Sequence, residues 1–283
     1  YGLIVGLAII LGLELIFKKA TQLGWQQEKL NNVALVGILG GVIGARMYHV
    51  LTDWQLYQHQ WWEALAIWQG GLGIPGAILG GGIGVWLLVR KNQQFHFIEL
   101  LDVAVFGLPF GQALGRVGNW INQELYGLPT QLPWAITIDS AHRLPGYETI
   151  ARYHPLFAYE AMLMLMFGFW VWGWHARQRH NPKWKIGTGR WFVVYAGFYA
   201  LSRFLLEFLR LEKNMIGKGM LSLNQVIMLV ILIAGGMWWL KTSQLKNKLS
   251  HISLVLFCSL FLIACQPKFG IDQQLRVATD HQQ

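Results

Sequence analysis

Residues 115–127 combine side chains that could bind an anionic group. The segment reads Gly-Arg-Val-Gly-Asn-Trp-Ile-Asn-Gln-Glu-Leu-Tyr-Gly and directly follows an apolar run, residues 95–114, that is long enough to cross a membrane. An arginine held at bilayer depth costs up to about 2.5–3.5 kcal/mol, so Arg116 is expected to have a partner, which is often an anion. A snorkelling arginine followed by a turn is the alternative interpretation, and it explains a lone arginine better than this cluster.

A second polar set recurs at helical spacing near residue 200. Tyr199, Arg203, Glu207 and Arg210 are separated by four, four and three residues, which predicts that they share one face of a helix. In an otherwise apolar helix this face should point into a helix bundle, where Glu207 can pair with either arginine. The set is either a structural ladder of ion pairs or a site where one arginine holds a phosphate with its planar fork.

Two arginine sites at one membrane edge suggest a ligand with an anionic head and apolar tails, and a phospholipid fits that description best. The chain has no Walker loop, dinucleotide-binding glycine pattern, His-Glu-x-x-His sequence or serine elbow at a suitable position. Its two cysteines, Cys258 and Cys265, cannot form a zinc or disulfide framework. We therefore expect neither a metal nor another cofactor.

The composition is that of a protein that crosses a membrane several times. Of its 283 residues, 54% are hydrophobic and only 13% are charged. The formal charge of +9 could indicate nucleic-acid binding, but the basic residues form short blocks between apolar runs. We therefore expect membrane lipid as a partner and no nucleic acid.

Seven apolar segments predict an all-α membrane protein with about seven transmembrane helices. They cover about residues 1–17, 33–51, 64–89, 97–115, 155–175, 190–210 and 221–240. The third contains a glycine-rich stretch, residues 69–77, that predicts a broken or re-entrant element, and Asp102 in the fourth should have a partner within the protein. Tyr1 already begins an apolar run, so we expect part of the natural N-terminus to be missing.

The basic residues predict the orientation of these helices. One set of alternate connections carries thirteen lysines and arginines and the other carries six. The positive-inside rule therefore places the first set in the cytoplasm and the N-terminus outside. The long connection 116–153 then forms a loop region on the outer face, on the same side as the polar cluster.

These residues resemble a known enzyme family. Residues 115–127 closely resemble the signature of bacterial prolipoprotein diacylglyceryl transferase, and this match is specific. The resemblance covers about residues 1–240 in order, and its other parts are Tyr1-Gly-Leu, Gly44-Ala-Arg-Met-Tyr48, Trp68-Gln-Gly-Gly71, His154-Pro155 with Tyr159-Glu160, and Tyr199 through Arg210.

The resemblance implies an enzyme of the bacterial inner membrane whose site faces the outer leaflet. It would move the diacylglyceryl group of phosphatidylglycerol onto the lipobox cysteine thiol of a prolipoprotein signal peptide and release glycerol 1-phosphate. Arg116 and Arg203 would stabilise the phosphate and the leaving-group charge. This agrees with the chemistry, because a thiolate that attacks a glycerol carbon needs fixed cations around the leaving phosphate where water is scarce.

The resemblance also implies roles for other residues. Asn119 and Glu124 would organise the head-group pocket, and Glu207 and Arg210 would hold Arg203. The residues expected to line the cavity or bind substrate are Tyr1, Arg46, Gly71, Gly127, Tyr199, Glu207 and Arg210.

The sequence departs from the family pattern at Pro75. The family often has a histidine in this glycine-rich segment, where it is a candidate base for the thiol. Here His154 is the candidate that takes the proton. Otherwise the thiol loses its proton to water, because the arginines favour the thiolate, or this protein is a weakly active member of the family. A free thiol is a few per cent ionised near neutrality, so a base is helpful but not indispensable.

Two other functions would use the same arginines without making a bond. One is a transporter or flippase for an anionic lipid, and the other is an inactive relative that only binds phospholipid or signal peptides. Release of glycerol 1-phosphate would separate the transferase from both.

Residues 243–283 follow the predicted transferase domain, residues 1–242, and have a different character. A basic stretch precedes thirteen mostly apolar residues, and Leu-Ile-Ala-Cys265 resembles a lipobox. One interpretation is a lipoprotein signal joined to the enzyme, with Cys265 as an acceptor thiol. The others are an eighth apolar helix with a chance cysteine, or a joining of neighbouring reading frames.

If Cys265 is an acceptor, mass spectrometry of the intact tail from membranes that make active enzyme should find a diacylglyceryl group on its thiol. An unmodified Cys265 in such membranes would exclude the acceptor role.

Overall fold

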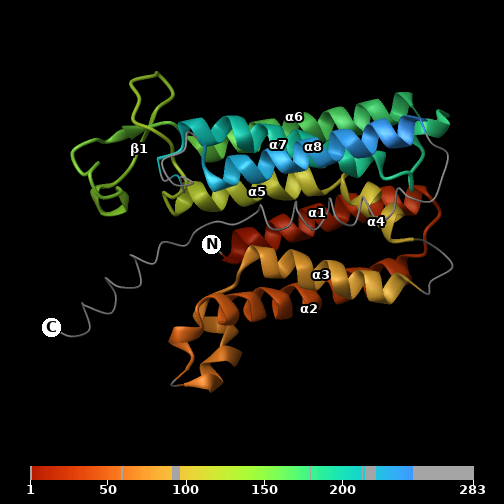
Figure 1. The fold of residues 1–283 in the computed structure, drawn as a ribbon, viewed down its shortest axis with the longest axis horizontal. Helices are drawn as coiled ribbons and strands as arrows, with labels where there is room; N and C mark the ends of the chain where they lie inside the picture. Colours follow the sequence, from red (N-terminus) through yellow and green to blue (C-terminus); the bar gives the residue numbers. More distant parts are fainter. Residues whose placement is uncertain are drawn as a thin grey trace.

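The computed structural model describes residues 2–58, 60–90, 96–178, 180–211, 213 and 221–244. Tyr1 and Cys265 lie outside the described residues, as does the tail from residue 245. Within the described part the chain forms eight α-helices and one short two-stranded antiparallel sheet (Figure 1).

The elements have the following bounds. The helices are α1 Gly2–Gln22, α2 Gln27–Thr52, α3 Ile74–Val89, α4 Phe97–Ala104, α5 Leu108–Ile121, α6 Leu156–Arg177, α7 Arg190–Leu206 and α8 Leu223–Gln244. The strands are β1 Ile136–Thr137 and β2 Arg152–Tyr153, with Ile136 opposite Tyr153.

The described helices are those of a membrane protein. Four of them are long and apolar enough to cross a membrane: α2, α6, α7 with the turn that follows it, and α8. The bent pair α4–α5 would make a fifth crossing. The predicted all-α membrane class is therefore confirmed. Helix α3 is apolar but shorter, and the residues before it, 70–73, are non-helical, as the glycine-rich stretch predicted.

The fourth predicted span is broken, which the sequence analysis did not anticipate. Helices α4 and α5 meet at an angle of 54°. Pro109 lies in the first turn of α5, where its missing N–H is tolerated but where its ring prevents the preceding helix from continuing. Helix α5 then extends to Ile121, so Arg116 and Asn119 lie in its last turns and not beyond its end.

Asp102 has the partner within the protein that was predicted. Its carboxylate is fully buried and accepts backbone N–H groups of Gly187 and Gly189, both at 2.9 Å, and of Phe192 at 3.1 Å. These donors belong to the start of α7, whose unpaired N–H groups and dipole favour a negative charge. Asp102 therefore fixes α4 to the beginning of α7.

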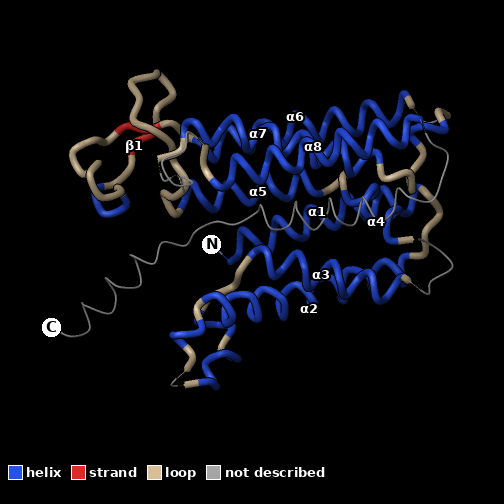
Figure 2. Tube along the Cα trace, in the orientation of Figure 1, coloured by secondary structure: helices blue, strands red, loops and turns tan. Residues whose placement is uncertain are grey.

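The helices form two parts that meet at α1 (Figures 1 and 2). Helices α5 to α8 pack together, and their core contains many aromatic side chains, among them Phe106, Phe167 and Trp191. Helices α2 and α3 form a hairpin on the other side of α1, where α2 contacts mainly α3. Figure 1 shows the sheet, the start of α1 and the end of α2 at one end of the molecule.

Glycines let α2 and α3 approach at backbone distance. A Cβ at Gly80 would lie 2.8 Å from the Cα of Gly44, and a Cβ at Gly40 would lie 2.7 Å from the carbonyl oxygen of Gly80. Real Cβ atoms essentially never come this close to backbone, so a larger residue would push the helices apart. Glycines at four-residue spacing, Gly40 with Gly44 and Gly76 with Gly80, therefore let these two helices pack closely.

We predict that Gly80→Ala lowers the free energy of unfolding by about 1–3 kcal/mol, because the methyl group overpacks the α2–α3 contact. Gly82→Ala is the matched control in the same helix, since a Cβ there meets nothing within 4 Å. Unfolding in detergent micelles would measure both, and equal midpoints for the two variants would contradict the prediction.

Candidate functional site

A buried carboxylate, Glu160, joins two arginines from different helices. Glu160 lies on α6 and is 7% exposed. One of its oxygens pairs with Nε of Arg116 on α5, and the other pairs with Nη1 of Arg203 on α7. Two guanidinium groups this close would repel each other, so the shared carboxylate is what allows them to converge.

This pairing corrects the predicted partner of Arg203. The family resemblance implies that Glu207 and Arg210 hold Arg203, whereas Arg203 forms its ion pair with Glu160. Glu160 belongs to the Tyr159-Glu160 motif of the family resemblance, but the sequence did not identify it as a site residue. The missed signal is its position: a carboxylate four residues into an apolar helix must have a cationic partner.

Glu207 pairs with Arg210, one of the two partners that its spacing allowed. Arg210 Nη1 lies 3.6 Å from Glu207 Oε2, while Glu207 Oε1 accepts the hydroxyl of Ser222 at 3.0 Å and the amide of Asn224 at 3.2 Å. Helix α7 ends at Leu206 and a 3₁₀ turn follows, so the predicted single helical face does not continue to Arg210. The tighter turn directs Glu207 toward the start of α8.

The predicted cluster after residue 115 does come together. Arg116 Nη1 donates to Asn119 Oδ1 at 2.9 Å, and Asn119 Nδ2 donates to Glu124 Oε1 at 2.8 Å. The chain reverses after α5 through left-handed backbone at Gln123, φ 50°, and Leu125, φ 55°, which few residues adopt without compensation. This reversal returns the Glu124 carboxylate to Asn119, which is 3% exposed.

Two cavities share Arg116. Among the described residues, three arginines and two glutamates line the small cavity, about 20 Å³, and give it a formal charge of +1. These residues are Arg116, Glu160, Arg203, Glu207 and Arg210. Three guanidinium groups meet two carboxylates here, so an anion in this cavity would balance the excess positive charge.

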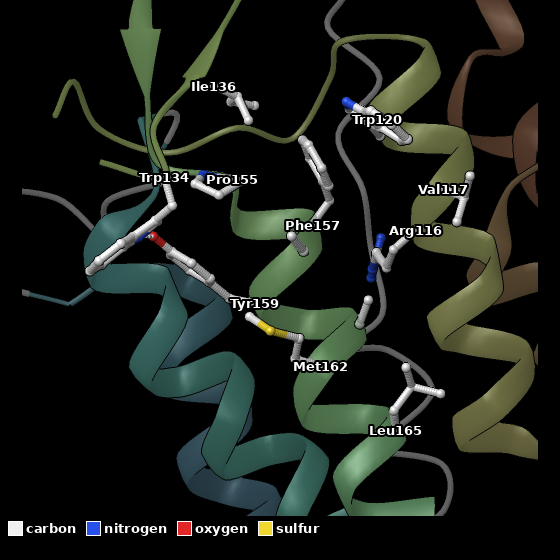
Figure 3. Close-up of a pocket in the computed structure, with 12 residues that line it drawn as sticks. Arg116, Val117, Trp120, Trp134, Ile136, Pro155, Phe157, Tyr159, Met162 and Leu165 are labelled. Atoms are coloured by element: carbon white, nitrogen blue, oxygen red, sulfur yellow. Dashed lines mark hydrogen bonds between the residues drawn. The ribbon is translucent and has the colours of Figure 1, made fainter. Parts of the chain in front are cut away.

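The large cavity, about 830 Å³, lies between α5, α6 and the outer loop (Figure 3). Most of its lining is apolar, including Val117, Trp120, Phe157, Ala161, Met162 and Leu165. Of the described residues that line it, Arg116 is the one that carries a charge, and it also lines the small cavity. Arg116 therefore lies where a large apolar cavity meets a cationic one with room for about one water, and this junction suits a ligand with an anionic head and apolar chains.

Tyr159 adds polar groups to the edge of the large cavity. Its hydroxyl lies 2.8 Å from Trp134 Nε1 and 3.1 Å from Nδ1 of His154. Figure 3 shows the Trp134 and Tyr159 side chains meeting. His154 thus contacts the cavity through Tyr159.

Gly127 joins the outer loop to the helix ends. Its N–H donates to the carbonyl of His154 at 2.8 Å, and its backbone pairs with Arg210 in an isolated antiparallel bridge. A Cβ at this position would lie 2.7 Å from the carbonyl oxygen of Leu209 and 3.0 Å from Cβ of His154. Only glycine fits between these segments.

Arg46 and Gly71 belong to the α2–α3 hairpin and not to the arginine cluster. Arg46 donates to the carbonyl oxygens of Ala64 at 2.8 Å, Gly70 at 2.7 Å and Gly71 at 3.2 Å, and it also bonds that of Glu63. These bonds hold the loop before α3, so Arg46 satisfies non-helical backbone that would otherwise be unpaired.

Tyr199 was predicted to line the cavity, and no metal site was expected. Tyr199 is buried on α7, one turn before Arg203. Among the residues that the structure describes, no group of three histidine, cysteine, aspartate or glutamate side chains could hold a metal ion.

Comparison with known proteins gives one consistent result. Residues 1–241 match the family model described as prolipoprotein diacylglyceryl transferase. The phosphatidylglycerol–prolipoprotein diacylglyceryl transferase of Cutibacterium acnes is 40% identical over 214 residues, which are 74% of this chain and 69% of that protein. The protein of the same name from Gloeobacter violaceus is 37% identical over 257 residues, 88% of this chain and 90% of the relative. A third, from Synechocystis sp., is 35% identical over 255 residues, 87% and 86% of the two chains.

We predict that Glu160→Gln lowers the free energy of unfolding by about 3–5 kcal/mol, because it leaves two buried guanidinium groups without their shared counter-charge. Glu28→Gln, at an exposed glutamate in the first turn of α2, is the matched control and should shift the unfolding midpoint far less. Chemical denaturation in detergent would measure both variants. An equal shift in the two would show that the Glu160 ion pairs do not stabilise the bundle.

Proposed function

The chain belongs to the prolipoprotein diacylglyceryl transferase family, and we propose that it transfers the diacylglyceryl group of phosphatidylglycerol to the cysteine thiol of prolipoproteins. The observation that carries this proposal is the position of Arg116, which pairs with Glu160 and lines both a cationic and an apolar cavity. A phospholipid head would bind among the arginines and its chains would extend into the large cavity.

In the proposed reaction the cysteine sulfur attacks the glycerol carbon that bears the phosphate. A carbon–sulfur bond forms, the carbon–oxygen bond to the phosphate breaks, and glycerol 1-phosphate leaves with the electron pair. Arg116 and Arg203 would stabilise the charge that develops on the leaving oxygen, since fixed cations in a water-poor site need no reorganisation. Glu160 would set the distance between them.

The other predicted residues have supporting roles in this proposal. Asn119 and Glu124 would orient Arg116 through the hydrogen bonds described above, and Glu207 would hold Arg210 near the head group. His154 would accept the thiol proton. Gly127 would shape the site through the outer loop, while direct substrate contacts of Tyr1, Tyr199, Arg46 and Gly71 remain predictions.

The relatives favour the transferase over the alternatives considered from sequence. All three carry the name of the transferase, and each aligns with at least 74% of this chain. A lipid transporter or an inactive binding protein would use the same arginines, but neither is what these relatives are named for.

We further propose seven membrane crossings, an N-terminus outside, and a site that faces the outer leaflet of the bacterial inner membrane. Adding α1 and α3 to the five candidate spans gives this number. The excess of lysine and arginine in one set of loops supports the orientation. The acceptor would be the lipobox cysteine of the signal peptide. The family match ends at residue 241, which supports a transferase domain of residues 1–242 that is separate from residues 243–283, the signal-like tail or extra apolar helix.

We predict that the purified protein in phosphatidylglycerol bilayers converts a synthetic lipobox peptide to the diacylglyceryl thioether and releases glycerol 1-phosphate. Arg116→Ala and Arg203→Ala should each reduce the rate by about 10²–10³, because each removes a fixed cation from the leaving phosphate. Peptide mass and released glycerol phosphate are the measurements.

Arg152→Ala is the control for this assay. Its exposed guanidinium bonds the carbonyl of Leu132 in the outer loop at 3.2 Å, so the variant should keep the wild-type rate. Phospholipid binding by the folded wild-type protein without either product would instead favour the transport or binding functions.

A further inference from the structure

Tyr159 borders the large cavity, where the proposed reaction needs a proton acceptor, and its hydroxyl is turned toward Trp134 (Figure 3). Tyr159 and Arg116 line the same large cavity (Figure 3), so a thiol held beside the arginine-bound head group is within the space that Tyr159 borders. A free thiol is only a few per cent ionised near neutrality, and the thiolate is the nucleophile. A proton acceptor at this cavity would therefore increase the reactive fraction.

The hydrogen-bond partners of Tyr159 determine which bond its hydroxyl accepts and which it donates. The indole N–H of Trp134 can only donate, so the Tyr159 oxygen accepts that bond at 2.8 Å. The Tyr159 O–H can then donate to Nδ1 of His154, 3.1 Å away. In this arrangement Nδ1 of His154 is the acceptor, and the Tyr159 oxygen retains a lone pair for a further donor.

The backbone holds His154 in place for this bond. Its N–H donates to the carbonyl of Leu128 at 3.1 Å, and its own carbonyl accepts from Gly127 at 2.8 Å. Pro155 follows it directly and begins the turn into α6. The imidazole is therefore fixed at the end of the helix that carries Tyr159.

Other candidate bases near the outer end are engaged elsewhere. Both oxygens of Glu160 are paired with guanidinium groups, which disfavours proton uptake. His49 Nδ1 lies 3.0 Å from the Asp53 carboxylate on the α2–α3 hairpin. Pro75, in the glycine-rich segment at the start of α3, has no group that accepts a proton.

We propose that Tyr159 and His154 form a proton relay for the acceptor thiol, with Trp134 orienting the hydroxyl. The S–H bond breaks as its proton passes to the Tyr159 oxygen, and the original Tyr159 proton passes to Nδ1 of His154, which becomes an imidazolium. The sulfur keeps the electron pair and attacks the glycerol carbon. The imidazolium returns its proton to water after the phosphate has left, so the relay is restored. This inference rests on the proposed transferase activity.

The test compares a lipobox peptide that contains cysteine with the same peptide that contains selenocysteine. A selenol is ionised at neutral pH and needs no proton acceptor. Tyr159→Phe and His154→Gln should reduce the rate with the cysteine peptide by about 100-fold, which is within the usual range for general-base catalysis. With the selenocysteine peptide, the rates of both variants should stay within about threefold of the wild-type rate. The selenolate needs no proton acceptor, and neither substitution changes the arginine site.

His142→Gln is the matched control, because His142 is an exposed histidine of the same outer loop. It should leave the rates with both peptides unchanged. Equal losses with the two peptides in His154→Gln would overturn the relay and assign His154 a structural role, and undiminished rates with cysteine would overturn it as well. A wild-type protein that forms no thioether or selenoether with either peptide would overturn the transferase function itself.

Discussion

The bundle depends on one shared carboxylate. Glu160 is the contact through which Arg116 of α5 and Arg203 of α7 can both face α6. A buried guanidinium without a counter-charge costs several kcal/mol, and two that converge would repel as well. The same ion pairs that allow the three helices to pack therefore also concentrate positive charge at one place in an apolar protein.

Helix α6 connects this charge to the apolar part of the site. Successive residues of a helix point about 100° apart, so Tyr159 and Glu160 reach different surroundings from neighbouring positions. Glu160 lines the small cationic cavity and Tyr159 lines the large apolar one. Asp102 and the α2–α3 glycines are not among the residues that line either cavity, and they contribute by fixing the helices to one another.

The sequence predicted the membrane class and the main polar residues, but not their partners. Spacing along the chain identified Glu207 with Arg210 and the group Arg116, Asn119 and Glu124, because those contacts are local. The pairs of Glu160 are not local: they span 44 and 43 residues and depend on how the helices pack. The bend before Pro109 was also missed, because hydrophobicity continues across it although the backbone does not.

The formal charge of +1 in the small cavity has a thermodynamic consequence. A phosphodiester head group carries one negative charge, so its arrival would bring the formal total to zero. Unbalanced charge in an apolar surrounding is unfavourable, and a ligand that binds only the folded state shifts the folding equilibrium toward it. The donor lipid is thus a component of the folded enzyme's stability, and the chain in a bilayer that lacks anionic lipid should be the more easily unfolded form.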